Sequence, residues 1–188
     1  MKKLLFLFAF VLGFVAPVSA YPGAGNFKLS LWDNIAFALP HNNISNIEGV
    51  DWGIGSRAHN VTGFQWDLIW AETNYLTGVS WAFGMSNVNQ AQGWQWAFVN
   101  KASNITGLQL GAVNMAADAT GAQLGGVNMS DRALVGAQIG FYNQAEYING
   151  VQFGLVNYAK YIYGLQLGIF NIAENGYLPA MVFINGRF

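Results

Sequence analysis

The sequence predicts an all-β protein built from tandem repeats. From residue 106 to residue 173 a unit of 14 or 15 residues recurs, with the consensus Gly-x-Gln-apolar-Gly-x-x-Asn-x-Ala and a short polar link. Counted from the first glycine, positions 2, 4 and 6 are apolar and alternate with Gly, Gln and Gly, which is the period of a β-strand. Two glycines among five residues also disfavour a helix, by about 1 kcal/mol each. Self-similarity at a fixed period is typical of stacked repeat folds.

Two columns of amide side chains mark the repeat. Weaker copies of the unit precede the regular ones and begin at Gly63, Gly78 and Gly93. If the units stack in register, like side chains lie on like, and the amides can form hydrogen bonds along the stack. The expected ladders consist of Gln109, Gln123, Gln138, Gln152 and Gln166, and of Asn114, Asn128, Asn143, Asn157 and Asn171.

Two arrangements of these strands fit the pattern. In a parallel β-solenoid each copy lies about 4.8 Å from the last, which explains the identical columns and the links of nearly equal length. We expect apolar columns inside this solenoid and a flat Gly-Gln-Gly face that contacts a partner. The alternative is an antiparallel outer-membrane β-barrel, in which each stretch of ten residues from Gly to Ala spans the membrane. Low charge, a Trp-rich first half and a strand ending in Phe188 favour that alternative.

The N-terminus predicts export. Met1-Lys2-Lys3, an apolar run and the small residues Val18-Ser19-Ala20 are typical of a secretory signal peptide, cleaved after Ala20. The predicted organisation is therefore a signal peptide at 1–20, N-terminal cap strands at 21–61, the repeat array at 62–175 and a closing strand at 176–188.

The cap region is less regular than the array. Residues 26–39 alternate and then continue apolar, so we predict one strand that ends at Pro40. Residues 50–55 predict a second strand, and residues 57–60 a turn.

Composition excludes several classes of protein. The chain has no cysteine, which excludes disulfides and lipid attachment through a thiol. Without Lys2 and Lys3, 6 basic residues remain against 9 acidic ones, a net charge of −3, so nothing attracts nucleic acid electrostatically. Charged residues are only 9% of the chain, so its surface is covered by amides and hydroxyls or faces lipid.

Candidate catalytic groups are few, and the sequence predicts no enzyme, no cofactor and no metal site. His41 and His59 are the two histidines, too few for a zinc site. Asp67 stands where the regular units carry glycine, and with Glu72 it is the one candidate carboxylate pair for glycan hydrolysis. That hydrolysis is a minor alternative to a non-catalytic role.

Tryptophans concentrate in the degenerate copies. They are suited to packing or interfacial anchoring, with stacking against a glycan as the alternative. The cluster consists of Trp66, Trp70, Trp81, Trp94 and Trp96.

The repeats also resemble a known family. Tandem GLQxGxxN units, a first strand KLSLWDNIAFALP at 28–40 and a last strand ending in Phe188 are similar to surface-repeat proteins of spirochaetes and other Gram-negative bacteria. That resemblance implies an envelope or surface position without catalysis. Similarity to curli amyloid subunits, through residues 109–116, is weaker because curli repeats are longer. We expect an exported structural or adhesive protein of the outer membrane, cell surface or periplasm, which binds an envelope partner, a glycan or another copy of itself.

Overall fold

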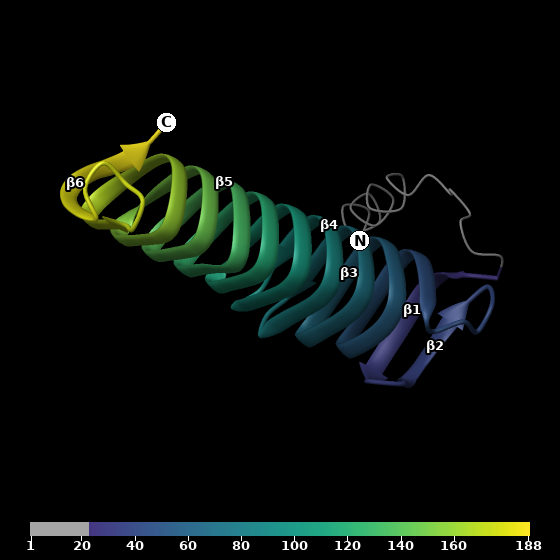
Figure 1. The fold of residues 1–188 in the computed structure, drawn as a ribbon. Helices are drawn as coiled ribbons and strands as arrows, with labels where there is room; N and C mark the ends of the chain where they lie inside the picture. Colours follow the sequence, from purple (N-terminus) through teal and green to yellow (C-terminus); the bar gives the residue numbers. More distant parts are fainter. Residues whose placement is uncertain (1–22) are drawn as a thin grey trace, which may run out of the picture.

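The computed structural model describes residues 23–188, and the predicted signal peptide at 1–20 lies outside them. The described residues form strands and turns, and include no helix that could cross a membrane. Figure 1 shows the chain wound into an elongated coil, with β1 and β2 at one end and β6 at the other. The strands are β1 (Gly25–Trp32), β2 (Ile35–Leu39), β3 (Asn46–Ala82), β4 (Met85–Trp96), β5 (Val99–Ala173) and β6 (Ala180–Arg187).

Successive units lie side by side and run parallel. Gly78 pairs with Gly93 between β3 and β4, and Gly93 pairs with Gly107 between β4 and β5. Each residue therefore lies beside its counterpart 14 or 15 residues later, and one such turn of the chain is called a coil below. The predicted parallel β-solenoid is confirmed. The antiparallel alternative is wrong, because antiparallel neighbours would not place like on like.

The first glycine of each coil has a backbone that other residues rarely adopt. Its φ lies between 126° and 151° in all nine coils. A Cβ added there would collide with the carbonyl of the preceding coil's first glycine or, at Gly49, with the Asn26 carbonyl of the cap. Glycine is therefore required by both conformation and space. The nine glycines are Gly49, Gly63, Gly78, Gly93, Gly107, Gly121, Gly136, Gly150 and Gly164.

The coil that begins at Gly49 was not recognised in the sequence. The stacked array thus extends about one unit further toward the N-terminus than the predicted boundary at residue 62.

The interior contains amides and small or aliphatic side chains. Glutamines at position 3 and asparagines at position 8 of the regular coils are fully buried, together with alanines at position 10, such as Ala145 and Ala159. The core is completed by the second-to-last residue of each unit, such as Leu134 and Ile148.

The apolar residues at positions 2, 4 and 6 point outward instead. The expected outward Gly-Gln-Gly face is therefore wrong, because this part of the unit is turned the other way. The apolar columns inside are the alanines and aliphatic residues of the second half of each unit. Inside, every amide finds a partner on the neighbouring coil.

Cap strands close both ends. Residues 26–39 form the two antiparallel strands β1 and β2 rather than one, because Asp33 adopts a left-handed φ of 53° and reverses the chain. β1 joins β3 in parallel, with Lys28 opposite Asp51, so the first rung of the glutamine column is a lysine. β6 pairs antiparallel with the last coil. Residues 57–60, predicted as a turn, lie within β3.

Cysteines introduced at paired exposed positions test the stacking. Gln92 pairs with Thr106 across β4 and β5, at the spacing of about 4.8 Å that neighbouring strands share and a disulfide can bridge. Gln92→Cys with Thr106→Cys should oxidise readily in this cysteine-free chain, as measured by a mobility shift on non-reducing gels. The control pair, Gln92→Cys with Thr120→Cys, lies two coils apart and should stay reduced. Equal oxidation of both pairs would contradict the register.

Candidate functional site: an apolar outer face over a core of amide ladders

The glutamine column forms a continuous chain of hydrogen bonds. Nε2 of Gln123 donates to Oε1 of Gln109 at 2.7 Å, and Gln109 donates to Gln95 at 2.9 Å. The second amide proton goes to a backbone carbonyl of the same coil, as from Gln109 to Met115 at 3.2 Å. The pattern continues through Gln138, Gln152 and Gln166.

The asparagine column runs in the opposite direction. Nδ2 of Asn114 donates to Oδ1 of Asn128 in the following coil at 2.8 Å, and also to the Leu124 carbonyl at 2.9 Å. The same pairs connect Asn128, Asn143, Asn157 and Asn171. Glutamine donors therefore face the N-terminal end and asparagine donors the C-terminal end, so the two rows of amide dipoles oppose each other.

A buried ion pair lies at the N-terminal end of the position-3 column, beyond Ser80, which stands in place of a glutamine and bonds to Ser86. Asp51 accepts hydrogen bonds from Gln65 Nε2 at 3.2 Å and from Ser56 at 2.6 Å, and it pairs with Lys28 Nζ at 3.3 Å. Burial raises the pKa of Asp51, while Lys28 and the hydrogen bonds oppose that shift. The donor end of the first glutamine thus meets an anion, which is the favourable orientation.

The two candidate catalytic carboxylates do not meet. Asp67 is fully buried in the core, and neither of its oxygens has a hydrogen-bond partner among the described residues. Glu72 lies at the surface in an ion pair with Arg57 at 3.2 Å. Burial, and then repulsion from Asp51, raises the pKa of Asp67 to about 8, so it is protonated at neutral pH. A neutral acid sealed in the core has no access to an external glycan.

Neither histidine belongs to a metal site. His59 contacts Asn74 at 2.8 Å and lies edge-on to Tyr75, while His41 is exposed in its loop. Within residues 23–188 no group of three or more histidine or acidic side chains could hold a metal ion.

The tryptophans form an outward column rather than a flat platform. Trp66 and Trp81 stack at 5.1 Å between ring centroids with 6° between planes, and Trp52 and Trp96 extend the row on either side. Trp66 and Trp81 each cover a ring face of the other, whereas stacking against a sugar needs a free ring face. Trp94 is exposed beside this row at position 2.

Trp70 lies apart from that row. It packs edge-on against Trp32, with the Arg57 guanidinium 6.0 Å from its ring centroid. Trp32 and Trp52 were not part of the predicted cluster. Trp52 stands at position 4 of the unrecognised first coil, and its place in that column was the signal for it.

The tryptophan row is one part of a larger apolar surface. Positions 2, 4 and 6 of all nine coils point outward, and none of them carries a charge. The apolar face, as we call this surface, consists of Val50, Trp52, Ile54, Phe64, Trp66, Leu68, Val79, Trp81, Phe83, Trp94, Trp96, Phe98, Leu108, Leu110, Ala112, Ala122, Leu124, Gly126, Ala137, Ile139, Phe141, Val151, Phe153, Leu155, Leu165, Leu167 and Ile169.

Charge is kept off this face. Ion pairs join neighbouring coils elsewhere, from Arg132 to Asp118 and from Lys160 to Glu146 in the second half of each unit. The exposed charged side chains of the coils therefore lie in the second half of each unit, apart from the apolar face. Contiguous exposed apolar surface of this extent is typical of a protein or membrane interface.

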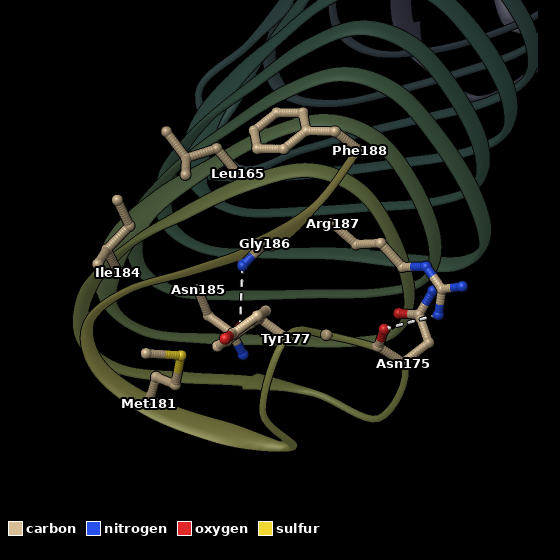
Figure 2. A pocket seen from close by; sticks show the side chains of 10 residues that line it. Leu165, Asn175, Tyr177, Met181, Ile184, Asn185, Gly186, Arg187 and Phe188 are labelled. Atoms are coloured by element: carbon tan, nitrogen blue, oxygen red, sulfur yellow. Dashed lines mark hydrogen bonds between the residues drawn. The ribbon is translucent and has the colours of Figure 1, made fainter.

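A cavity also opens at the C-terminal end, between the last coil and β6. It has a volume of about 680 Å³ and is lined by Leu165, Tyr177, Ile184 and Arg187 among others (Figure 2). Its polar groups are bonded within the cap, since Arg187 donates to the Asn175 carbonyl at 3.1 Å and Asn185 donates to the Leu178 carbonyl at 2.9 Å. We attribute a capping role to these contacts.

No protein-family model, curated protein or solved structure matches this chain.

Replacing one amide of the ladder should cost much more stability than replacing an exposed one. Gln138 donates to Gln123 and to the Gln144 carbonyl, and it accepts from Gln152. Gln138→Leu leaves these partners in the core without their hydrogen bonds. The expected loss is about 3 kcal/mol in the free energy of unfolding. Chemical denaturation measures it, with the exposed Gln90→Leu as control. Equal, small losses in both variants would contradict a stabilising ladder.

Asp67 should make stability depend on pH. Its pKa is 3.8 unfolded and about 8 folded, so the stabilisation from its bound proton is complete below about pH 4 and is lost as pH rises to 8. Each pH unit in that window costs about 1.4 kcal/mol. Asp67→Asn removes this titration. The free energy of unfolding of the variant should therefore rise, relative to that of the parent chain, as the pH increases from 4 to 8. Denaturation at four pH values measures the gain. A difference between Asp67→Asn and the parent chain that does not change with pH would refute the assignment.

Proposed function

We propose that this chain is an exported, non-catalytic structural protein of a Gram-negative outer membrane or cell surface, which associates with its surroundings through the apolar face. The observation that carries the proposal is that face, which is uncharged along the whole solenoid. An isolated soluble protein rarely leaves such a surface bare, because about 25 cal/mol is gained for each Å² removed from water.

Other features support the same role. The predicted signal peptide and the resemblance to surface-repeat proteins favour an envelope position. The burial of Asp67 and the surface ion pair of Glu72 argue against glycan hydrolysis, and the stacked Trp66 and Trp81 argue against a sugar platform.

Cell fractionation tests the proposal. The full chain, expressed with its predicted signal peptide in a Gram-negative host, should remain with the envelope after osmotic release of soluble periplasmic proteins. The double variant Phe98→Ser with Phe141→Ser removes two side chains that are 65% and 70% exposed on the apolar face, and should be released several-fold more. The matched control is Tyr147→Ser, at 48% exposure outside the apolar face.

Two results would contradict the proposal. One is equal release of the parent chain and the double variant. The other is retention lost to the same degree in the Tyr147→Ser control.

A further inference from the structure

We propose that the partner covering the apolar face is a second copy of this chain, in an antiparallel, two-fold symmetric dimer. This inference rests on the proposed function, since it names the occupant of the surface through which the protein associates. It is carried by the size of the face, by protruding phenylalanines on one half of it and by a groove on the other half.

The size of the face suits a dimer. Nine coils at about 4.8 Å each, and the five residues from position 2 to position 6 at about 3.3 Å each, give roughly 43 Å by 17 Å, or on the order of 700 Å² per copy. Two copies would bury on the order of 1,400 Å², within the range of stable protein–protein interfaces. Stacking two β-sheets face to face, about 10 Å apart, is also a common way to bury such surfaces.

Two phenylalanines protrude from the N-terminal half of the face. Phe83 and Phe98 occupy position 6 of the third and fourth coils and are 73% and 65% exposed. They lie on adjacent rungs, because the Phe98 amide donates to the Phe83 carbonyl at 3.3 Å. Because these two large apolar side chains are left in water, they are the strongest candidates on that half for insertion into a partner. We call Phe83 and Phe98 the knobs.

A groove on the C-terminal half matches these knobs in chemistry. It has a volume of about 570 Å³ and runs between position 4 and position 6 of the last coils, and Phe183 of β6 also lines it. Its floor is backbone at Gly140, Gly154 and Gly168, and its walls include Phe141, Phe153 and Leu155. Every residue that lines it is glycine or apolar, so it offers an aromatic ring contact without any polar group to desolvate.

A single rotation brings knobs and groove together. A two-fold axis in the plane of the interface, perpendicular to the solenoid and between the fifth and sixth coils, exchanges coils three and four with coils eight and seven. Phe83 and Phe98 of each copy then face the groove of the other. The axis passes beside Ala112, Ala122 and Gly126, whose small side chains allow close approach. The contact is isologous, so it closes as a dimer and does not extend into a filament.

The experiment measures the mass of the mature chain in detergent-free buffer by sedimentation equilibrium. We expect a dimer, which dissociates at least tenfold more readily in the double variant Phe83→Asp with Phe98→Asp. The control Tyr147→Asp should remain dimeric, and circular dichroism checks that each variant is folded. A second measurement uses single cysteines and a short bis-maleimide. Leu124→Cys, near the axis, should crosslink to a dimer, whereas Met129→Cys, outside the apolar face, should not.

Three outcomes would overturn the proposal. One is a monomer that instead binds vesicles of zwitterionic phospholipid, which would assign the face to lipid. The second is a dimer unaffected by the Phe83 and Phe98 substitutions. The third is equal crosslinking from Leu124→Cys and Met129→Cys. Because envelope retention is measured separately, a monomer that is retained in cells would refute the dimer and leave the proposed function standing.

Discussion

The fold depends on hydrogen bonds between amide side chains on successive coils. A buried amide without a partner costs roughly 1–3 kcal/mol, so Gln and Asn are tolerated in this core only because the stack supplies a partner at every rung. A coil shifted by one residue would lose these bonds in both columns at once. The ladders therefore fix the register of the solenoid as well as fill its interior, and the glycine at the start of each coil allows the backbones to approach closely enough for them to form.

Much of this architecture could be predicted from the sequence. Identical residues at a fixed spacing predict parallel stacking, and the amide columns follow from it. The direction in which the columns point could not be predicted, because period-2 alternation shows which residues share a face and not which face is inside. The usual preference for apolar cores gave the opposite orientation to the observed one. The alanine at position 10 was a signal, because a core column that small leaves little room for Phe141 or Trp94.

The irregular end was harder to interpret for a different reason. The coil that begins at Gly49 has Asp51 in place of glutamine, so it lacks the residue that identifies the repeat. The structure explains this substitution, because Asp51 meets Lys28 of the cap and accepts the hydrogen bond from Gln65. A similar argument holds for Asp67, whose buried and protonated state depends on neighbours that are distant in sequence. The ionisable residues of this core, Lys28, Asp51 and Asp67, all lie in the cap and the first two coils.

The opposed directions of the two ladders have a consequence for length. If both columns donated toward the same end, each added coil would increase an electric moment along the axis, and charge of one sign would have to collect at each cap. Here a coil adds one glutamine dipole and one asparagine dipole of opposite sense, so the moments largely cancel. Arrays of this unit can therefore grow or shrink by whole coils in evolution without any change in the electrostatics of their ends.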